Sequence, residues 1–305
     1  MAVDKFDVRP GDRRTNLFAR CPLTFYFVIA FGGTWIVWSL FVLSQDGAGL
    51  LPFRSPTSFM LIMFLGQVLG PTLAAFVMTA VMEGKPGLRR FLRRIIEWRV
   101  GIHWYLLVLV GIPAIMTFGT IVLPGILPSF KPFEHPLSEL LQYLIFYIYP
   151  ALIIGGPLFE EIGWRGFALP RLEQRCGPMA ASLLLGIVWG IWHMPVWFSG
   201  QWTEPTISNI FFFLSWISAA TFIYTWLFNN TKGSLLMAIL AHASMDAFPN
   251  AILWPLFPAA TKLTEYGFLY GYLGLIVGFG ATAVLLIFFT RGRLGYQHYS
   301  PENGS

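Results

Sequence analysis

Long uncharged stretches, each able to cross a lipid bilayer, are the feature that most constrains the fold of this chain. The hydrocarbon core of a bilayer is about 30 Å thick, and an α-helix needs about 20 apolar residues to span it. Seven stretches between successive charged residues meet that length, and an eighth is interrupted only by Asp246. In chain order they are residues 21–45, 55–82, 104–130, 140–159, 176–203, 205–231, 233–261 and 266–290.

The composition agrees with lipid as the solvent of this chain. Charged residues make up 11% of the sequence, against roughly 25% in a soluble domain. Only helices and closed barrels satisfy all backbone groups in lipid, and the strand-length alternation of a barrel is absent. The sequence therefore predicts an all-α fold, a polytopic bundle of eight transmembrane helices that forms a single membrane domain over residues 1–305.

The positions of Lys and Arg predict how the bundle is oriented. If the N-terminus lies inside, all but three of the 20 Lys and Arg residues fall in inner segments; the exceptions are Arg54, Lys131 and Lys262. Because cytoplasmic loops carry the excess of basic residues, we expect a multi-pass protein of the cell membrane with both termini in the cytoplasm. The same bias accounts for the net charge of +5 without a nucleic-acid partner.

The connector between predicted helices two and three, residues 87–101, has the pattern of a basic amphipathic helix. Its apolar side chains recur at helical spacing and its arginines fill the other face, which is typical of a helix on the cytoplasmic leaflet. The apolar positions are Leu88, Phe91, Leu92, Ile95 and Ile96, and the basic ones are Arg89, Arg90, Arg93 and Arg94.

The segment FEEIGWRGFALPRLEQR, residues 159–175, places two adjacent carboxylates at the end of the fourth uncharged stretch. Glu161 and Arg165 are four residues apart, so on a helix they share one face and can pair. Glu160 points about 100° away and has no cation in its own helix. An unpaired carboxylate in a dry site suits a general base, whereas Glu161 would be structural. The alternative is that all three residues end a helix at the water interface.

His193 lies inside the fifth uncharged stretch, one turn after Trp189. A single buried histidine is usually a hydrogen-bonded core residue, but its position along the helix favours a role in a site. Residues 176–178, Cys-Gly-Pro, predict the turn between helices four and five. Glu160 and His193 are each about sixteen residues from that turn, so an antiparallel hairpin places them at matching heights.

His242 and Asp246, four residues apart in the seventh helix, lie on one helical face. Counted from Lys232 at the cytoplasmic edge, His242 is about 15 Å deep, which is comparable to the depth of His193. A charged side chain at the bilayer centre costs about 2.5–3.5 kcal/mol on insertion scales, so such residues are functional by default. We expect the three helices to form a catalytic core within residues 138–260.

Three motifs in this order resemble those of the CPBP family of membrane proteins. They are Glu-Glu-x-x-x-Arg from Glu160 to Arg165, Trp-x-x-x-His from Trp189 to His193, and His-x-x-x-Asp from His242 to Asp246. That family groups CAAX prenyl endopeptidases of the Rce1 type with bacterial bacteriocin-immunity-type membrane proteases. The resemblance covers about half of the chain, and it departs at Asp246, where the eukaryotic enzymes have Asn.

The resemblance implies a role for each motif. Glu160, helped by His193, would activate a water molecule for attack on a peptide carbonyl. His242 and Asp246 would stabilise the oxyanion, with Trp189 as a supporting residue. The sequence leaves the metal open: Glu160, His193, His242 and Asp246 would supply a zinc set, whereas a glutamate mechanism would use the same residues without a cofactor.

The leading hypothesis is therefore an intramembrane endopeptidase of a bacterial plasma membrane, either CAAX-protease-like or of the bacteriocin-processing and self-immunity type. Its partners would be a peptide or membrane-associated protein substrate and the lipid bilayer. Intramembrane Glu, Asp and His also build the relays of proton- or ion-coupled transporters, although no internal repeat is visible here. The third hypothesis is a non-catalytic immunity or scaffold protein.

Overall fold

The computed structural model describes residues 17–148, 156–202, 204–262 and 270–296, and within these ranges the chain forms helices and no strand. The helices in chain order are α2 (Leu17–Arg20), α3 (Pro22–Val42), α4 (Phe59–Gln67), η1 (Val68–Thr72), α5 (Leu73–Ile95), α6 (Ile102–Leu106), η2 (Leu107–Gly111), α7 (Ile112–Ile121), η3 (Leu127–Ser129), α8 (Pro136–Gln142), η4 (Tyr143–Ile148), α10 (Gly156–Gly163), η5 (Trp164–Ala168), α11 (Leu169–Trp192), α12 (Met194–Trp197), α13 (Ile207–Asn230), α14 (Leu235–Phe248), η6 (Pro249–Leu253), α15 (Trp254–Leu256), η7 (Pro258–Thr261) and α16 (Tyr270–Thr290).

Seven continuous helical segments of the described chain are long and apolar enough to cross a membrane. One of them, Gly156–Trp192, reverses at Gly177, which has the non-helical angles φ 75° and ψ 166°. Trp189 Nε1 lies 2.6 Å from Glu160 Oε2, although 29 residues of straight helix would separate them by about 44 Å. This segment is therefore the predicted hairpin with its turn at Gly177. Counted as two arms, it brings the described part of the chain to the eight predicted helices.

The position predicted for the fourth membrane helix, residues 140–159, is wrong. Helix α8 and the π-helical turns of η4 form a separate short helix, residues 149–155 lie outside the described ranges, and the membrane helix runs from Gly156 toward the turn at Gly177. The prediction counted only uncharged residues, so it ended this helix before its first charged residue. Glu161 and Arg165 are nevertheless tolerated inside it because they neutralise each other within the protein. Glu160 and Glu161 thus lie within the helix, and the alternative of a helix end at the water interface is excluded.

The basic amphipathic connector is present and is set off from the second membrane helix by a bend. Gly84, with φ 62° and ψ −159°, interrupts the long helical segment Phe59–Ile95. Beyond the bend Phe91 is buried, whereas Arg89 is exposed. Arg94 donates to the carbonyls of Gly233 (3.1 Å), just before α14, and of Gly166 (3.2 Å) in η5, so the connector is fastened to the central helices.

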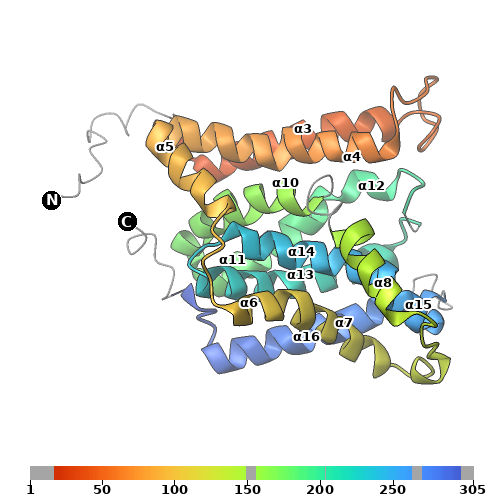
Figure 1. Ribbon diagram of the computed structural model, residues 1–305. Helices are drawn as coiled ribbons and strands as arrows, with labels where there is room; N and C mark the ends of the chain where they lie inside the picture. The colour runs from red at the N-terminus through yellow and green to blue at the C-terminus, as the bar shows by residue number, and fades with distance from the viewer. Residues whose placement is uncertain (1–16, 149–155, 203, 263–269, 297–305) are drawn as a thin grey trace.

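The helices are arranged in three groups that lie roughly parallel to one another (Figure 1). Helices α3, α4 and α5 form one outer group, and α6, α7 and α16 form the opposite one. Between them lie α10, α11, α13 and α14, with α11 packed on α13. The residues predicted to carry chemistry are on α10, α11 and α14, so the fold places them in the middle of the bundle.

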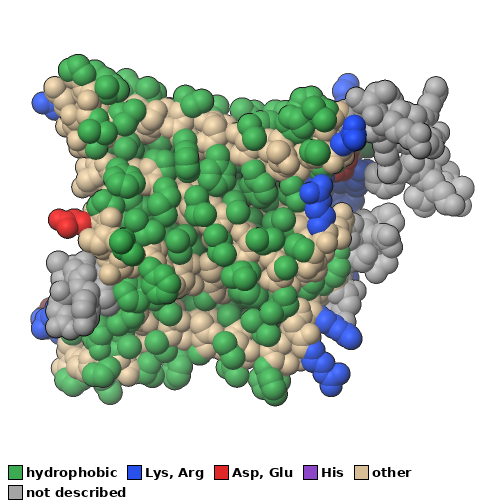
Figure 2. All heavy atoms as spheres, turned by 180° about the vertical axis from the view of Figure 1, so that it is seen from behind, with side chains coloured by type: hydrophobic (Ala, Val, Ile, Leu, Met, Phe, Trp, Pro, Cys, Tyr) green, Lys and Arg blue, Asp and Glu red, His purple; other side chains and the backbone are tan. Residues whose placement is uncertain are grey.

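The outer surface is divided as a bilayer requires. Figure 2 shows hydrophobic side chains over most of one face, with more of the visible Lys and Arg at one end of the bundle than at the other. Large apolar side chains such as Ile36, Met60 and Phe288 are 70% or more exposed, as expected where lipid is the solvent. The chain is thus a multi-pass membrane protein, and the basic end is the one predicted to face the cytoplasm.

Small residues allow helices α7 and α16 to pack closely. A Cβ atom placed on Gly119 would overlap the Gly274 carbonyl, and one on Gly278 would overlap the Ile115 carbonyl. Lipid provides no hydrophobic driving force between helices, so such close backbone contact supplies the van der Waals energy that holds them together.

We predict that Gly278→Val lowers the free energy of unfolding by about 1–3 kcal/mol, because overpacking forces α7 away from α16. Gly280→Val is the control on the same helix, since nothing lies within 4 Å of a Cβ atom there. The thermal unfolding midpoints of the detergent-purified variants test this. Equal midpoints for the two variants would contradict the packing argument.

Candidate active site

The structure brings the predicted site residues together from three central segments. Glu160 and Glu161 are on α10 and Arg165 is on η5 of the same membrane helix; Trp189 is on α11, His193 directly follows α11, and His242 and Asp246 are on α14. All of them except His193 and Asp246 are buried.

Glu160 is a buried carboxylate that is hydrogen-bonded but not paired with a Lys or Arg of the described chain. Its Oε2 accepts a hydrogen bond of 2.6 Å from the indole of Trp189, and its Oε1 accepts one of 3.3 Å from Gln67 Nε2. Its side chain is only 4% exposed. These two neutral donors orient the carboxylate without neutralising its charge, so it retains the capacity to accept a proton.

His193 directs one ring nitrogen at Glu160. Nδ1 lies 2.9 Å from the Trp189 carbonyl, which can only accept, so Nδ1 carries a proton. In the neutral ring Nε2 then holds a lone pair, and it lies 4.0 Å from Glu160 Oε2. Aromatic rings enclose the imidazole, with Trp202 stacked at 5.8 Å and Trp192 edge-on at 4.7 Å.

Glu161 is held by an ion pair buried from solvent. Its Oε1 accepts from Arg165 Nη1 at 2.8 Å and from His242 Nδ1 at 2.9 Å, and both Glu161 and Arg165 are 0% exposed. The guanidinium lies over the rings of Trp189 (4.4 Å to the centroid) and Tyr224 (4.7 Å). The Glu161 carboxylate and the faces of these two rings thus together stabilise the positive charge of Arg165. The helical spacing correctly predicted that Arg165 pairs with Glu161 and leaves Glu160 unpaired.

His242 lies between two carboxylates. Its Nδ1 is bound by Glu161, and its Nε2 faces Asp246 Oδ2 at 3.4 Å. The Asp246 side chain is 44% exposed, so this edge of the site is open whereas the Glu161 edge is closed. The ring of Trp189 meets His242 edge-on at 5.1 Å and also binds Glu160, so one indole links both halves of the site.

The four residues that would supply a zinc set do not form one. Across the described residues, no group of three or more His, Cys, Asp and Glu side chains could hold a metal ion. Glu160 and His193 form one pair and His242 and Asp246 another, while the Nδ1 atoms of both histidines are occupied by Trp189 and Glu161. The donor set therefore does not fit a metal with three protein ligands and an open position.

Gln67 and Tyr224 are among the contributors to the site that were not predicted from the sequence. Gln67, on α4 of an outer group, reaches Glu160, and Tyr224, on α13, forms part of the aromatic surroundings of Arg165. The sequence could have indicated Gln67, because it is the only amide side chain in the uncharged stretch 55–82. Amide side chains in membrane helices form hydrogen bonds between helices. Tyr224 carried none, because an aromatic residue in a membrane helix is ordinary.

Removal of the buried cation tests the Glu161–Arg165 pair. We predict that Arg165→Met lowers the free energy of unfolding by about 3–5 kcal/mol, because it leaves a buried carboxylate without its counter-charge. The double variant Arg165→Met with Glu161→Gln should regain part of the loss, since a neutral amide can still accept from His242. Thermal unfolding in detergent measures both. A double variant less stable than the single one would refute this account.

Comparisons with known proteins match the part of the chain that carries the site. Residues 141–248 match a family described as type II CAAX prenyl endopeptidase Rce1-like, and this range contains all three motifs. The chain is also 29% identical over 233 residues to CAAX prenyl protease 2 of Methanococcus maripaludis, covering 71% of this chain and 80% of that protein. Over the part that carries the three motifs, the chain is therefore similar to the Rce1-like CAAX prenyl endopeptidases.

Proposed function

We propose that the protein is a CAAX-protease-like intramembrane endopeptidase in which Glu160 and His193 activate the attacking water. The observation that carries this proposal is the spacing of 4.0 Å between His193 Nε2 and Glu160 Oε2, in a site where no described Lys or Arg forms an ion pair with Glu160. One water molecule can hydrogen-bond to both atoms at about 2.8 Å. The family relationship supports peptide-bond hydrolysis over transport or a purely structural role.

The reaction follows from the donors and acceptors in place. The water donates one hydrogen to Glu160 and one to the His193 lone pair, and its oxygen attacks the scissile carbonyl carbon as Glu160 takes the proton. The carbonyl oxygen takes the electron pair of the C=O π bond and becomes the oxyanion of a tetrahedral intermediate. When the C–N bond breaks, the proton passes from Glu160 to the leaving amine. The products are a carboxylic acid and an amine, and Glu160 is again a carboxylate.

His242 is the proposed donor to the oxyanion, and Asp246 its positioning residue. A donor at Nε2 requires a proton there as well as on Nδ1, which already binds Glu161. Carboxylates at both ring nitrogens suit that doubly protonated ring. Stabilisation of this charge in a water-poor site is usually the largest catalytic contribution. The eukaryotic enzymes have Asn at this position, and an amide can donate a hydrogen bond to an oxyanion. In this proposal Asp246 does not donate to the oxyanion, because His242 does.

The proposed substrate is a peptide or protein segment at the membrane. The curated relative carries the name CAAX prenyl protease 2, so a prenylated CAAX peptide is the first reporter to test, with its unprenylated form beside it. Processing of a bacteriocin-type peptide in a bacterial plasma membrane is the narrower alternative. Preference for the unprenylated form would favour that alternative.

We predict that Glu160→Gln abolishes cleavage while the protein inserts and purifies normally, because the amide cannot accept the proton of the attacking water. Loss of general-base catalysis alone costs about 100- to 10,000-fold in rate. The control is Glu173→Gln, which changes another buried carboxylate on the same hairpin, where Asn229 Nδ2 donates to it at 2.7 Å. Initial rates on the reporter peptide in proteoliposomes provide the measurement.

Cleavage by Glu160→Gln at the wild-type rate would refute the proposed role of Glu160. If neither the wild type nor the variant cleaves the reporters, the substrate is sought in cells. Peptides in the membrane fractions of cells with wild-type protein are then compared with those of cells with the variant. Peptides truncated only with the wild type support the protease, and substrate uptake without any truncation supports a transporter.

We also predict that the endopeptidase activity does not depend on a metal. The purified enzyme should keep its initial rate after incubation with EDTA and dialysis, because its candidate ligands form two separate pairs. Rates before chelation, after chelation and after addition of zinc are compared. A loss that zinc restores would overturn the metal-free mechanism.

A further inference from the structure

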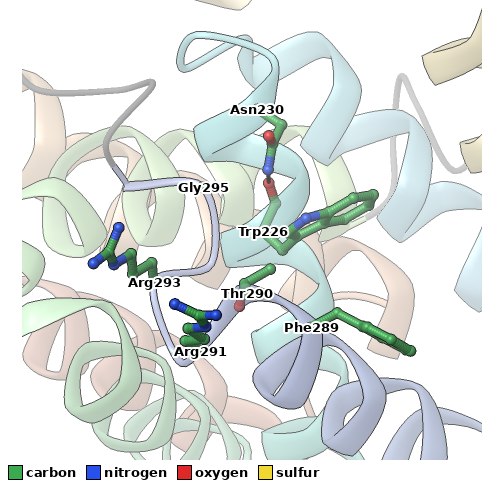
Figure 3. A pocket seen from close by; sticks show the side chains of 7 residues that line it. All are labelled: Trp226, Asn230, Phe289, Thr290, Arg291, Arg293 and Gly295. Atoms are coloured by element: carbon green, nitrogen blue, oxygen red, sulfur yellow. Dashed lines mark hydrogen bonds between the residues drawn. The ribbon is translucent and has the colours of Figure 1, made fainter.

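Two adjoining hollows lie at the basic end of the bundle, where α13 and α16 end. The first, of about 300 Å³, is lined by polar and aromatic groups that include Trp226, Asn230, Arg291 and Arg293 (Figure 3). The second, of about 750 Å³, is lined by apolar side chains that include Met179, Ile287 and Phe288. Phe289 and Arg291 line both. None of the proposed catalytic residues lines either hollow.

The loop that carries the two arginines is held in a defined shape. Arg291 and Leu294 adopt positive φ angles of 51° and 44°, which non-glycine residues rarely do. Leu294 is fully buried, and its carbonyl accepts a hydrogen bond of 3.1 Å from Asn229. The Leu294 amide in turn donates to Thr290 Oγ1 at 3.2 Å. Surrounding contacts therefore hold this loop after α16 in one backbone conformation.

The hollows combine positive charge with access from the lipid side. Phe288 and Phe289, in the last turn of α16, are 73% and 76% exposed, so this face of the helix is in contact with hydrocarbon. Arg291 follows directly and forms no ion pair with another described residue. Within a few residues the surface thus changes from an apolar face to a cationic loop, which is the arrangement that an amphiphilic anion requires.

We propose that the two hollows form a binding site for one anionic phospholipid. The phosphate lies between Arg291 and Arg293, with the Asn230 side of the first hollow beside the headgroup. An acyl chain lies in the second hollow against Met179 and Ile287. A free anion would use only the first hollow, and a neutral lipid would leave the guanidinium of Arg291 without a counter-charge. The ligand that matches both hollows carries a negative headgroup and a hydrocarbon chain.

Lipid titration of the purified full-length protein tests the site. In a neutral detergent, native mass spectrometry measures the binding of phosphatidylglycerol, phosphatidylcholine and glycerol 3-phosphate, which has the charge but no acyl chain. We expect phosphatidylglycerol to bind most tightly. Arg291→Gln should weaken its binding about five-fold, since a basic residue near an anionic headgroup contributes on that scale. Arg89→Gln, an exposed arginine at the same end of the bundle, is the control and should have no effect.

A second variant tests the apolar hollow. Met179→Asn, which places a polar group there, should weaken phosphatidylglycerol and phosphatidylcholine alike and leave glycerol 3-phosphate unchanged. Equal losses in the Arg291 and Arg89 variants would overturn the proposal, because they would show a general effect of charge at this end. Binding of glycerol 3-phosphate as tight as that of phosphatidylglycerol would also overturn it, since the acyl chain would then contribute nothing.

Discussion

The ion pair between Glu161 and Arg165 is the interaction on which the centre of this protein depends. A charge removed from water costs several kcal/mol unless good partners surround it. Here the partners come from several helices: His242 on α14 binds the carboxylate, while Trp189 on α11 and the α13 side chains Tyr224 and Thr221 contact the guanidinium. The need to satisfy two buried charges therefore holds four central helices at fixed rotation and height.

This arrangement explains how two adjacent glutamates can have different roles. Glu161 is bound at Oε1 by both Arg165 and His242 and is inaccessible to solvent, so it is suited to hold His242 and not to react. Glu160, one residue earlier, faces the neutral donors Trp189 and Gln67 and the lone pair of His193. The turn of about 100° between successive helical residues thus separates a structural carboxylate from one that can exchange a proton.

The structure at the basic end of the bundle is determined by the boundary between lipid and water. At the basic end, Gly84 turns the amphipathic half of α5 away from the second membrane helix, and Arg94 fastens it to the central helices. At the same end, the loop after α16 places Arg291 beside the exposed side chains of Phe288 and Phe289. The proposed chemistry is confined to the middle of the bundle, and the proposed lipid contact to its rim.

The sequence by itself determined the features that depend on neighbours along the chain. Uncharged length identified the membrane helices apart from the position of the fourth, i,i+4 spacing paired Glu161 with Arg165, and Gly177 before Pro178 marked the hairpin turn that aligns Glu160 with His193. Contacts between helices were decided only by the tertiary structure, because packing sets how far each helix is rotated and shifted. That is why Gln67 reaches Glu160, why the four proposed zinc ligands separate into two pairs, and why the fourth membrane helix could begin near Gly156 with its charges inside.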